Sequence, residues 1–255
     1  MIDERVLADL VRRLEEDPSV LFVTGAGLSA DSGLPTYRGV GGLYEGQSVA
    51  EGIPIEEALS GGMFRRNPAL TWKYIKQIEA ACRGAGPNRA HEFMAALEKR
   101  LSRVVVLTQN VDGLHRAAGS NAVIEIHGNV HDLRCTLCAW TDRVNDYRQM
   151  SAGIPECPVC TSIVRPRVVL FGEMLPPLGI RRLEEELSRG FDVVFSVGTT
   201  SVFPYISAPV HQVKRAGGLT VEINPGESEV SHAVKHRVRA GAADVLGQLG
   251  MLLGF

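Results

Sequence analysis

The chain has 255 residues, of which 45% are hydrophobic and 22% charged, and its formal net charge at pH 7 is -2. This composition is typical of a globular protein with a full core, and the small net charge excludes a strong general attraction to nucleic acid or membranes. The charged amphipathic N-terminus and the absence of roughly 18 consecutive apolar residues predict a cytoplasmic protein without signal peptide or membrane span.

Short β-branched runs alternate with helical patterns along the chain. The apolar spacing predicts helices at about 3–16, 65–82, 88–100, 178–188 and 204–215, and a last one after 240–242. Strands are predicted at about 19–24, 103–107, 122–126, 168–171, 191–197 and 218–224, with a loop at 40–64. This alternation indicates an α/β protein with a mostly parallel sheet, helices on both faces, and ligands at the carboxyl ends of the strands.

The segment TGAGLSADSGLPTYRG follows the first predicted strand and contains Gly25-x-Gly27-x-x-Ala30, the spacing of a dinucleotide-phosphate loop. The glycines allow close approach of a pyrophosphate, and a helix that starts at Ser29-Ala30 would direct free N–H groups toward it. After Asp31 the pattern leaves the helix almost at once, as expected for a lid over the ligand. The segment therefore predicts a dinucleotide site.

Hydride transfer is not the chemistry that this site favours. A redox dinucleotide fold has an acidic residue about 20 positions after the glycines, at the end of the second strand. Here that distance falls on Glu45 and Glu51, within the predicted loop, and the better strand-end candidates for ribose contacts are Glu222 and Asn224. We therefore expect a bound dinucleotide that serves another reaction.

Four of the five cysteines form two CxxC pairs, Cys135/Cys138 and Cys157/Cys160. Two such knuckles place four thiolates in the tetrahedral arrangement that Zn²⁺ prefers, and a fully protein-bound ion leaves no open position for catalysis. We predict one structural zinc ion, with a redox dithiol as the alternative. The fifth, Cys82, is expected to be an inert helix thiol, because no base stands near it in the sequence.

His127 ends a predicted strand, close to where Gln109, Asn110 and Asp112 end the preceding one. A neutral imidazole there could accept a proton from a hydroxyl near physiological pH. A structural histidine is the alternative for any single His, but these polar neighbours favour the catalytic interpretation.

Together these elements resemble the sirtuin family of NAD-dependent protein lysine deacylases. The resemblance extends over the whole chain, through GAGLSADSGLPTYRG, TQNVDGLH, IHG, the CxxC pairs, RPRVVLFGE, GTTS and VEINP in that order. It implies that NAD is consumed: its nicotinamide leaves, and the acyl group moves from lysine to the ribose. Longer or acidic acyl groups, and mono-ADP-ribosyl transfer, are the alternative activities; a catalytically idle NAD sensor or zinc-ribbon binding module is the alternative of a different class.

The resemblance also assigns roles to individual residues. His127 would be the catalytic base and Asn110 a second catalytic residue. The NAD contacts that it implies are Gly25, Ala26, Gly27, Ala30, Tyr37, Arg38, Gln109, Asn110, Asp112, Gly198, Thr199, Ser201, Asn224 and Ala242. The loop from Gly198 to Pro204 is one residue shorter than usual in the family, which leaves the adenosine contacts there less defined.

The acyl-lysine peptide is expected beside an extended segment, with contacts from Val168, Phe171, Gly172 and Glu173. Relatives that prefer acidic acyl groups carry Tyr-x-x-Arg in the helix before the Pro-Asn pair. When this chain is aligned to that motif with a one-residue gap, Tyr74 and Gln77 stand at the Tyr and Arg positions. Without the gap, Ile75 and Ile78 stand there. Because the arginine clamp for a carboxylate is missing, we predict acetyl or other uncharged acyl groups, with Lys76 as a weak substitute for the clamp.

The implied architecture is a Rossmann-like domain and a smaller zinc-bearing part, with both substrates in the cleft between them. The predicted divisions are 1–39, 85–129 and 170–255 for the large domain, 130–169 for the zinc module, and 40–84 for the helical part. We expect a monomer whose partners are acyl-lysine proteins or peptides, without direct nucleic-acid or membrane binding.

Overall fold

A computed structural model describes residues 3–35 and 52–255 of the chain. The predicted NAD contacts Tyr37 and Arg38, and most of the predicted lid, lie outside these residues. Among the described residues, no helix combines the length and apolar character needed to cross a membrane.

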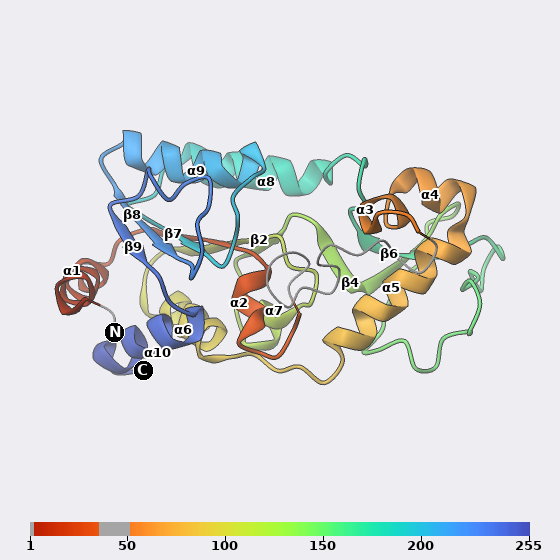
Figure 1. Cartoon of the computed structure of the whole chain (residues 1–255), viewed down its shortest axis with the longest axis horizontal. Helices are drawn as coiled ribbons and strands as arrows, with labels where there is room; N and C mark the ends of the chain where they lie inside the picture. The colour runs from red at the N-terminus through yellow and green to blue at the C-terminus, as the bar shows by residue number, and fades with distance from the viewer. Residues whose placement is uncertain (1–2, 36–51) are drawn as a thin grey trace.

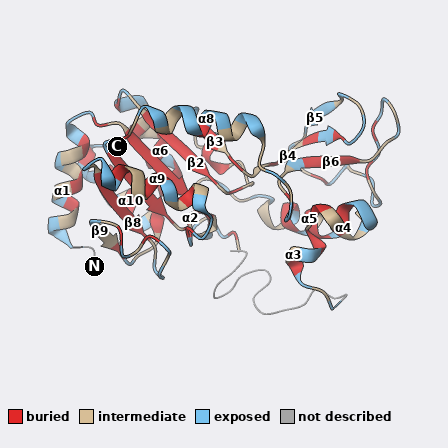
Figure 2. Cartoon of the chain, turned by 90° about the horizontal axis from the view of Figure 1, so that it is seen from above, coloured by how far each residue is buried: buried red, intermediate tan, exposed pale blue. Residues whose placement is uncertain are grey.

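The larger sheet has six strands, all parallel, in the order β3-β2-β1-β7-β8-β9 (Figure 1). These strands are β1 (Val20–Thr24), β2 (Val104–Thr108), β3 (Val123–Glu125), β7 (Val193–Val197), β8 (Leu219–Ile223) and β9 (His236–Val238). Every residue of β1, β2, β7 and β8 is buried, because helices cover both faces of the sheet (Figure 2). The predicted α/β class with a Rossmann-like parallel sheet is confirmed.

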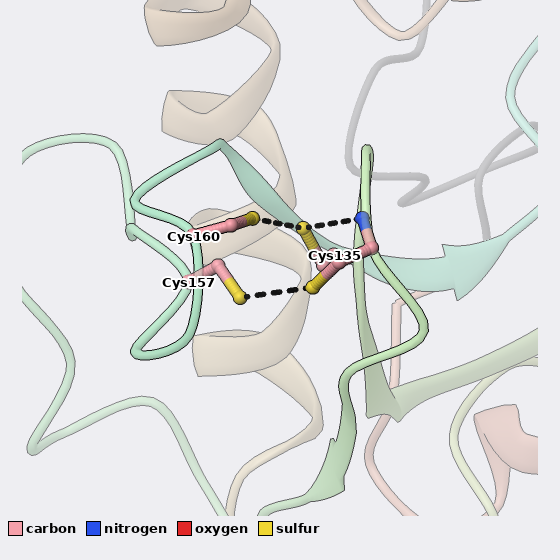
Figure 3. A group of neighbouring side chains, drawn as sticks. Cys135, Cys157 and Cys160 are labelled. Carbon is pink, nitrogen blue, oxygen red and sulfur yellow. Dashed lines mark hydrogen bonds between the residues drawn. The ribbon is translucent and has the colours of Figure 1, made fainter.

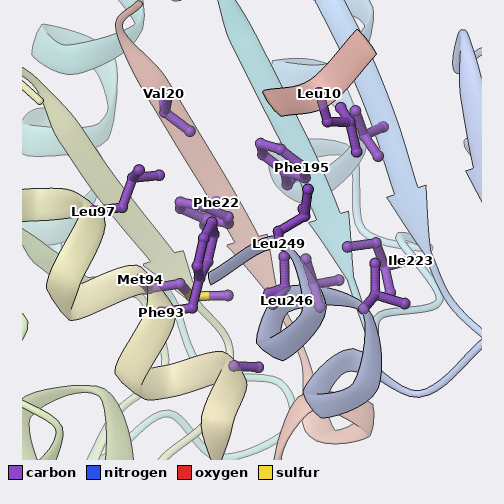
Figure 4. Close-up of a cluster of buried hydrophobic side chains, with 14 of the residues drawn as sticks. Leu10, Val20, Phe22, Phe93, Met94, Leu97, Phe195, Ile223, Leu246 and Leu249 are labelled. Carbon is purple, nitrogen blue, oxygen red and sulfur yellow. The ribbon is translucent and has the colours of Figure 1, made fainter. Parts of the chain in front are cut away.

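Alternate residues of each central strand enter two different cores. On one face, Phe22 of β1 stacks on Phe195 with ring centroids 4.9 Å apart and meets the edge of Phe93 (Figure 4). On the other face, Leu21 and Val23 pack beneath different helices. The first face is covered by α1 (Glu4–Glu15), α6 (Arg89–Arg100) and α10 (Ala242–Leu253), and the second by α8 (Pro177–Ser188) and α9 (Pro204–Arg215).

A smaller antiparallel sheet, in the order β5-β4-β6, carries the cysteine pairs and packs with three helices at the other end of the molecule (Figure 1). Its buried side chains form a core of their own around Trp72, Tyr147 and Val164. Its elements are β4 (Gly128–Cys135), β5 (Thr141–Arg143), β6 (Val164–Val168), α3 (Ile55–Ala58), α4 (Gly61–Arg66) and α5 (Pro68–Cys82). The predicted domain division and its boundaries stay a prediction.

Several local predictions were wrong, and each has a physical reason. The helix predicted at 65–82 is divided, because Asn67 caps α5 and Pro68 cannot continue α4. Residues 55–66 form short helices rather than loop. No strand spans 168–171: β6 ends at Val168, and Phe171 instead forms an isolated bridge to Ser60.

Candidate active site

Gly25 and Gly27 lie where the chain leaves β1, directly against Gly198 at the end of β7. The sheet grows in opposite directions from this pair of strands, and doubly wound sheets bind ligands at such a switch point. The Gly27 amide donates to the Gly198 carbonyl over 2.8 Å. A Cβ on Gly27 would lie 2.8 Å from the Gly198 Cα, and Gly198 has a φ of +58°. Neither position has room for a side chain, so the bare backbone faces the ligand edge.

The short helix α2 (Ala26–Ala30) begins directly after this turn, three residues earlier than the predicted start at Ser29-Ala30. Its N-cap is Gly25, which has no side chain to satisfy the first amides. The chain leaves the helix at Asp31, as the sequence indicated. The glycine turn and the first amides therefore lie together at the switch point.

Asn110 and Asp112, which follow β2, are joined to α2 through one hydroxyl. The Asn110 amide donates to Ser29 Oγ over 3.0 Å and to the Gly25 carbonyl over 3.1 Å. Ser29 Oγ in turn donates to Asp112 Oδ2 over 2.7 Å, and the Leu114 amide donates to Asp112 Oδ1. Burial raises the pKa of Asp112, although these two hydrogen bonds act against the shift. Two strand ends are thus fixed to each other by buried polar contacts.

A second bridge crosses the site between the ends of β2 and β7. The Gln109 side chain donates to Thr199 Oγ1 over 2.8 Å, and the Asn224 amide donates to the Thr199 carbonyl over 3.0 Å. Ser201, with a φ of 53°, donates its amide to the same Thr199 hydroxyl. The four side chains predicted here therefore meet at one edge of the sheet.

His127 connects β3 to β4 and lies between Gln109 and the start of α9. Its Nδ1 is 3.1 Å from the Gln109 carbonyl oxygen, and its Nε2 is 2.7 Å from the Tyr205 hydroxyl. Burial lowers the pKa of His127, while the Gln109 carbonyl opposes that shift. The imidazole is therefore neutral at physiological pH, as a general base must be.

A cavity of about 30 Å³ lies between α2 and α5, with Ser29, Asn110 and Asp112 on its polar side. Cys82 and Ile78 of α5 also line it. Burial, with Asp112 and Glu79 nearby, raises the pKa of Cys82 to about 12, so the thiol stays protonated. The prediction of an inert thiol agrees with this environment, but its place in the wall of a cavity was not foreseen.

Other candidates lie at the same edge or turn away from it. Ala242 is the first residue of α10. The backbone amide of the next residue, Ala243, donates to Asp31, which directly follows the end of α2 at Ala30. Glu222, expected among the ribose contacts, is fully buried, accepts hydrogen bonds from two serines and pairs with Arg237. That carboxylate is occupied inside the fold, so its assignment to the ribose was wrong.

Glu173 stabilises the segment expected to bind the peptide through hydrogen bonds within the protein. Arg165 donates to both its carboxylate oxygens, at 2.6 and 2.9 Å, and the Leu170 amide donates over 3.0 Å. Burial alone would raise the pKa of Glu173, but these hydrogen bonds lower it overall. Phe171, two residues before Glu173, is 42% exposed. Gly172 lies between these two residues, and Val168 precedes them. Glu173 therefore acts on the shape of the segment, and Phe171 offers an open apolar surface.

The side chains of α5 distinguish the two alignments with the Tyr-x-x-Arg motif, which place either Gln77 or Ile78 at the position of the arginine. Ile78 lines the cavity, Gln77 is exposed, and Tyr74 is buried in the core of the small domain. Lys76 donates to the carbonyls of Ser151, Ala152 and Gly153 at 2.6, 2.9 and 2.6 Å. The suggestion that Lys76 might replace the missing arginine was wrong, because these carbonyls hold its ammonium.

The four predicted metal ligands converge (Figure 3). Their sulfur atoms all lie within 4.8 Å of one another, with Cys135–Cys160 at 3.4 Å and Cys138–Cys157 at 3.6 Å. A tetrahedral zinc ion with Zn–S distances of about 2.3 Å separates its sulfurs by about 3.8 Å. The amides of Leu137 and Cys138 donate to Cys135 Sγ, as in a zinc knuckle. The arrangement fits one zinc ion bound by protein alone.

The model of the Sir2 family matches residues 25–204, which is more than half of the chain. The chain belongs to the Sir2 family. The predicted resemblance to sirtuins is therefore confirmed. A Pseudomonas aeruginosa protein named NAD-dependent protein deacylase 2 is 47% identical over 95% of both chains. A Pyrococcus furiosus NAD-dependent protein deacylase is 38% identical over 96% of both.

Solved structures give the same assignment. A Sir2 homologue in complex with NAD has a TM-score of 0.84 and 34% identity, covering 98% of this chain and 93% of its own. A Sir2 protein with a deacetylated p53 peptide and 3'-O-acetyl-ADP-ribose has a TM-score of 0.84 and 29% identity, covering 97% and 98%. The first of these structural neighbours contains NAD, and the four-cysteine cluster of this chain could hold one metal ion.

Two residues of the site were missed from the sequence. Ser29 stands inside the quoted glycine segment, where a hydroxyl directly after the turn could have indicated a role. Tyr205 gave no signal, because only the fold brings the start of α9 to His127 across 78 positions.

Proposed function

We propose that this chain is an NAD-dependent deacylase of protein lysine side chains, with acetyl and other uncharged acyl groups as its substrates. Its products are free lysine, nicotinamide and O-acyl-ADP-ribose. The observation that carries the proposal is the neutral, half-buried imidazole of His127, held through Gln109 to the strand end that also carries Asn110 and Asp112.

The first part of the reaction breaks the bond between nicotinamide and its ribose. Positive charge then develops on the ribose, and the acyl oxygen of the lysine substrate, a weak nucleophile, attacks it. Positioning and exclusion of water must supply much of the acceleration. Asn110 and Asp112 are rigid because Ser29 links them, and they face the cavity in which we place the nicotinamide carboxamide.

The second part requires a base. Nε2 of His127 takes the proton from a ribose hydroxyl, and the resulting oxygen attacks the carbon of the transferred acyl group. One water molecule then adds to that carbon and the bond to the lysine nitrogen breaks, which releases free lysine and leaves the acyl group on the ribose. Because Nδ1 faces a carbonyl, which can only accept, Nδ1 carries the hydrogen and Nε2 is free to accept. General-base catalysis of this kind contributes about 10²–10⁴-fold.

The remaining predicted contacts complete the proposed binding mode. Ala26, Gly27 and Arg38 hold the diphosphate, and Tyr37 covers the nicotinamide side. Gln109 lies against the nicotinamide ribose, while Gly198, Thr199, Asn224 and Ala242 contact the adenosine half. Zinc, bound by the four cysteines, supplies folding free energy to the small domain and takes no part in the chemistry. The substrate peptide lies along the segment that contains Phe171 and Gly172, recognised mainly through its backbone.

The preference for uncharged acyl groups rests on the wall that α5 contributes. Ile78 lines the cavity and Ile75 is buried in the core of the small domain. The described lining of the cavity includes no lysine or arginine that could clamp an acidic acyl group. A monomeric state and a cytoplasmic location remain predictions from the sequence.

The decisive experiment incubates the full-length protein and NAD with peptides that carry acetyl-, butyryl- or succinyl-lysine, and reads the products by mass. A lighter acetyl peptide together with O-acetyl-ADP-ribose supports the proposal. A peptide heavier by one ADP-ribose identifies ADP-ribosyl transfer instead, and no nicotinamide release with any peptide excludes an active enzyme. Faster succinyl than acetyl removal overturns the acyl preference alone.

A further inference from the structure

The nitrogen of His127 that the reaction needs already has a partner in this structure. Tyr205 places its hydroxyl 2.7 Å from Nε2, while Nδ1 faces the Gln109 carbonyl at 3.1 Å. Because the carbonyl fixes the hydrogen on Nδ1, the Tyr205 hydroxyl must be the donor in its contact with Nε2. The imidazole is thus held at both nitrogens.

We propose that Tyr205 is a positioning residue for the base, which stands in for the ribose hydroxyl until the dinucleotide binds. Its hydroxyl keeps the ring in the orientation and tautomer in which Nε2 accepts, and then yields that place to the ribose. The inference rests on the proposed function. Tyr205 keeps its own proton throughout, and the ribose proton passes directly to Nε2.

The surroundings of Tyr205 allow this exchange. The phenol is the second residue of α9 and stacks on Phe203, with ring centroids 5.5 Å apart and an interplanar angle of 13°. Both rings meet the imidazole nearly at right angles, at 81° and 89°. Phe203 is 44% exposed, whereas Ile206, one position after Tyr205, is fully buried. Tyr205 is itself partly buried against the core beneath α9, so the exchange requires its hydroxyl to leave Nε2 while Ile206 keeps that side of α9 in place.

The contact is also chemically simple to test. Among the described residues, no carboxylate or cation contributes to the shift in the pKa of His127: burial lowers the pKa, and the Gln109 carbonyl acts against that shift. Burial raises the pKa of Tyr205, so the phenol remains a donor over the working pH range. A change in the titration of His127 after loss of the phenol hydroxyl can therefore be assigned to that hydrogen bond.

The test measures the pKa of His127 by NMR in the full-length protein with labelled histidine and tyrosine, comparing wild type with Tyr205→Phe. Without ligand, loss of a donor to the Nε2 lone pair should raise the proton affinity of His127 about 3- to 10-fold, which is about 0.5–1 pH unit. With saturating ADP-ribose, both proteins should titrate alike, because the ribose has replaced the phenol. Ser207→Ala is the matched control, since it removes an exposed hydroxyl that donates to the Phe203 carbonyl at the same end of α9.

Wild-type protein provides a second measurement that needs no variant. The ring resonances of Tyr205 should shift when ADP-ribose binds, and a Tyr205 signal that stays unchanged overturns the exchange. An unchanged pKa of His127 in ligand-free Tyr205→Phe overturns the positioning role.

Kinetic measurements distinguish the replacement of the Tyr205 hydroxyl by the ribose from a direct role of Tyr205 in proton transfer. We expect Tyr205→Phe to lower KM for NAD about 3- to 10-fold, with kcat within about 2-fold of wild type, because one hydrogen bond less must be broken on binding. A tenfold or greater fall in kcat at unchanged KM would place the phenol in the proton path and contradict the proposal. If the His127 pKa differs between the two proteins as expected and the Tyr205 resonances shift with ADP-ribose, but wild-type protein shows no deacylation, the proposed function is refuted and the exchange still stands.

Discussion

The side-chain amide of Asn110 lies 3.0 Å from the hydroxyl of Ser29, and this contact joins the end of β2 to the helix that follows β1. The same hydroxyl donates to Asp112, so one small side chain orients both polar groups that face the cavity. Loss of Ser29 would leave a buried amide without one acceptor and a buried carboxylate without one donor.

We therefore expect Ser29→Ala to slow nicotinamide release. A hydrogen bond to a charged group contributes about 1.5–3 kcal/mol, which corresponds to about a 10- to 150-fold lower rate. Single-turnover release of nicotinamide, with NAD and acetyl peptide saturating, is the measurement. Ser32→Ala is the control, because Ser32 accepts from Asn88 at the far side of the same turn. Equal rates for the two variants would show that Ser29 does not orient the site.

His127→Ala should keep the fold and abolish most deacylation. Within residues 3–35 and 52–255, the hydrogen-bond partners of the imidazole are the Gln109 carbonyl and the Tyr205 hydroxyl, so its loss opens a local space at the site edge. The expected fall in kcat/KM is about 10²–10⁴-fold, with a Tm close to that of wild type. His232→Ala, at an exposed position, should retain full activity. A near-normal rate in His127→Ala would exclude this residue as the base.

The larger sheet could be predicted from the sequence, because buried parallel strands are continuous β-branched runs. Val104–Thr108 and Val193–Val197 are mostly β-branched, and every residue of both strands is buried. His236–Val238 does not, since a short edge strand with two polar residues is indistinguishable from a loop. The Asn67-Pro68 pair indicates the division between α4 and α5, because Asn caps a new helix and Pro cannot continue the preceding one. The apolar spacing continues across this pair, and the prediction followed the spacing.

The site could be predicted only where its residues stand in motifs. His127, Asn110 and the four cysteines belong to such motifs, and the structure brings the cysteine sulfurs together as the spacing required. Contacts that depend on tertiary packing have no local signature. Tyr205 reaches the imidazole, and Ile78 the cavity, only because α9 and α5 pack where they do.

Removal of zinc should unfold the small domain. Cys135 and Cys157 belong to the buried core of that domain, and β5, which pairs with β4, has no buried residue of its own. We expect Cys138→Ser to bind less than about a tenth of one zinc per chain and to lose several kcal/mol of folding free energy. Metal analysis and thermal unfolding are the measurements. Cys82→Ser should keep one zinc, because Cys82 lies outside the cluster; zinc retained by Cys138→Ser would contradict the four-ligand site.

An arginine introduced at Ile78 should shift the acyl preference. Ile78 lines the same cavity as Asp112, whereas the neighbouring Gln77 is exposed. A bidentate guanidinium there can clamp an acidic acyl group, which a wild-type isoleucine cannot. We expect Ile78→Arg to raise the succinyl-to-acetyl ratio of kcat/KM at least about tenfold, and Gln77→Arg to leave it unchanged. A larger change in Gln77→Arg would place the acyl group on the other face of α5.

The last prediction concerns stability against pH and rests on His91 and His115. These rings lie behind the glycine turn with centroids 4.9 Å apart, and His115 Nε2 is 3.0 Å from Thr24 Oγ1. Burial lowers the pKa of His91 to about 4, and burial together with His91 lowers that of His115 to about 3. Both rings are therefore neutral in the folded protein at any pH above about 5.

Because the unfolded chain protonates these rings near pH 6.5, it binds protons before the folded protein does as the pH falls. Their contribution to stability is complete above about pH 6.5 and is lost toward pH 4, at up to about 1.4 kcal/mol per pH unit for each ring. Urea unfolding between pH 7.5 and 4.5 measures this slope. His91→Gln should reduce the slope by up to half, and His232→Gln, at an exposed position, should not. An unchanged slope in His91→Gln would mean that this ring is protonated alike in both states.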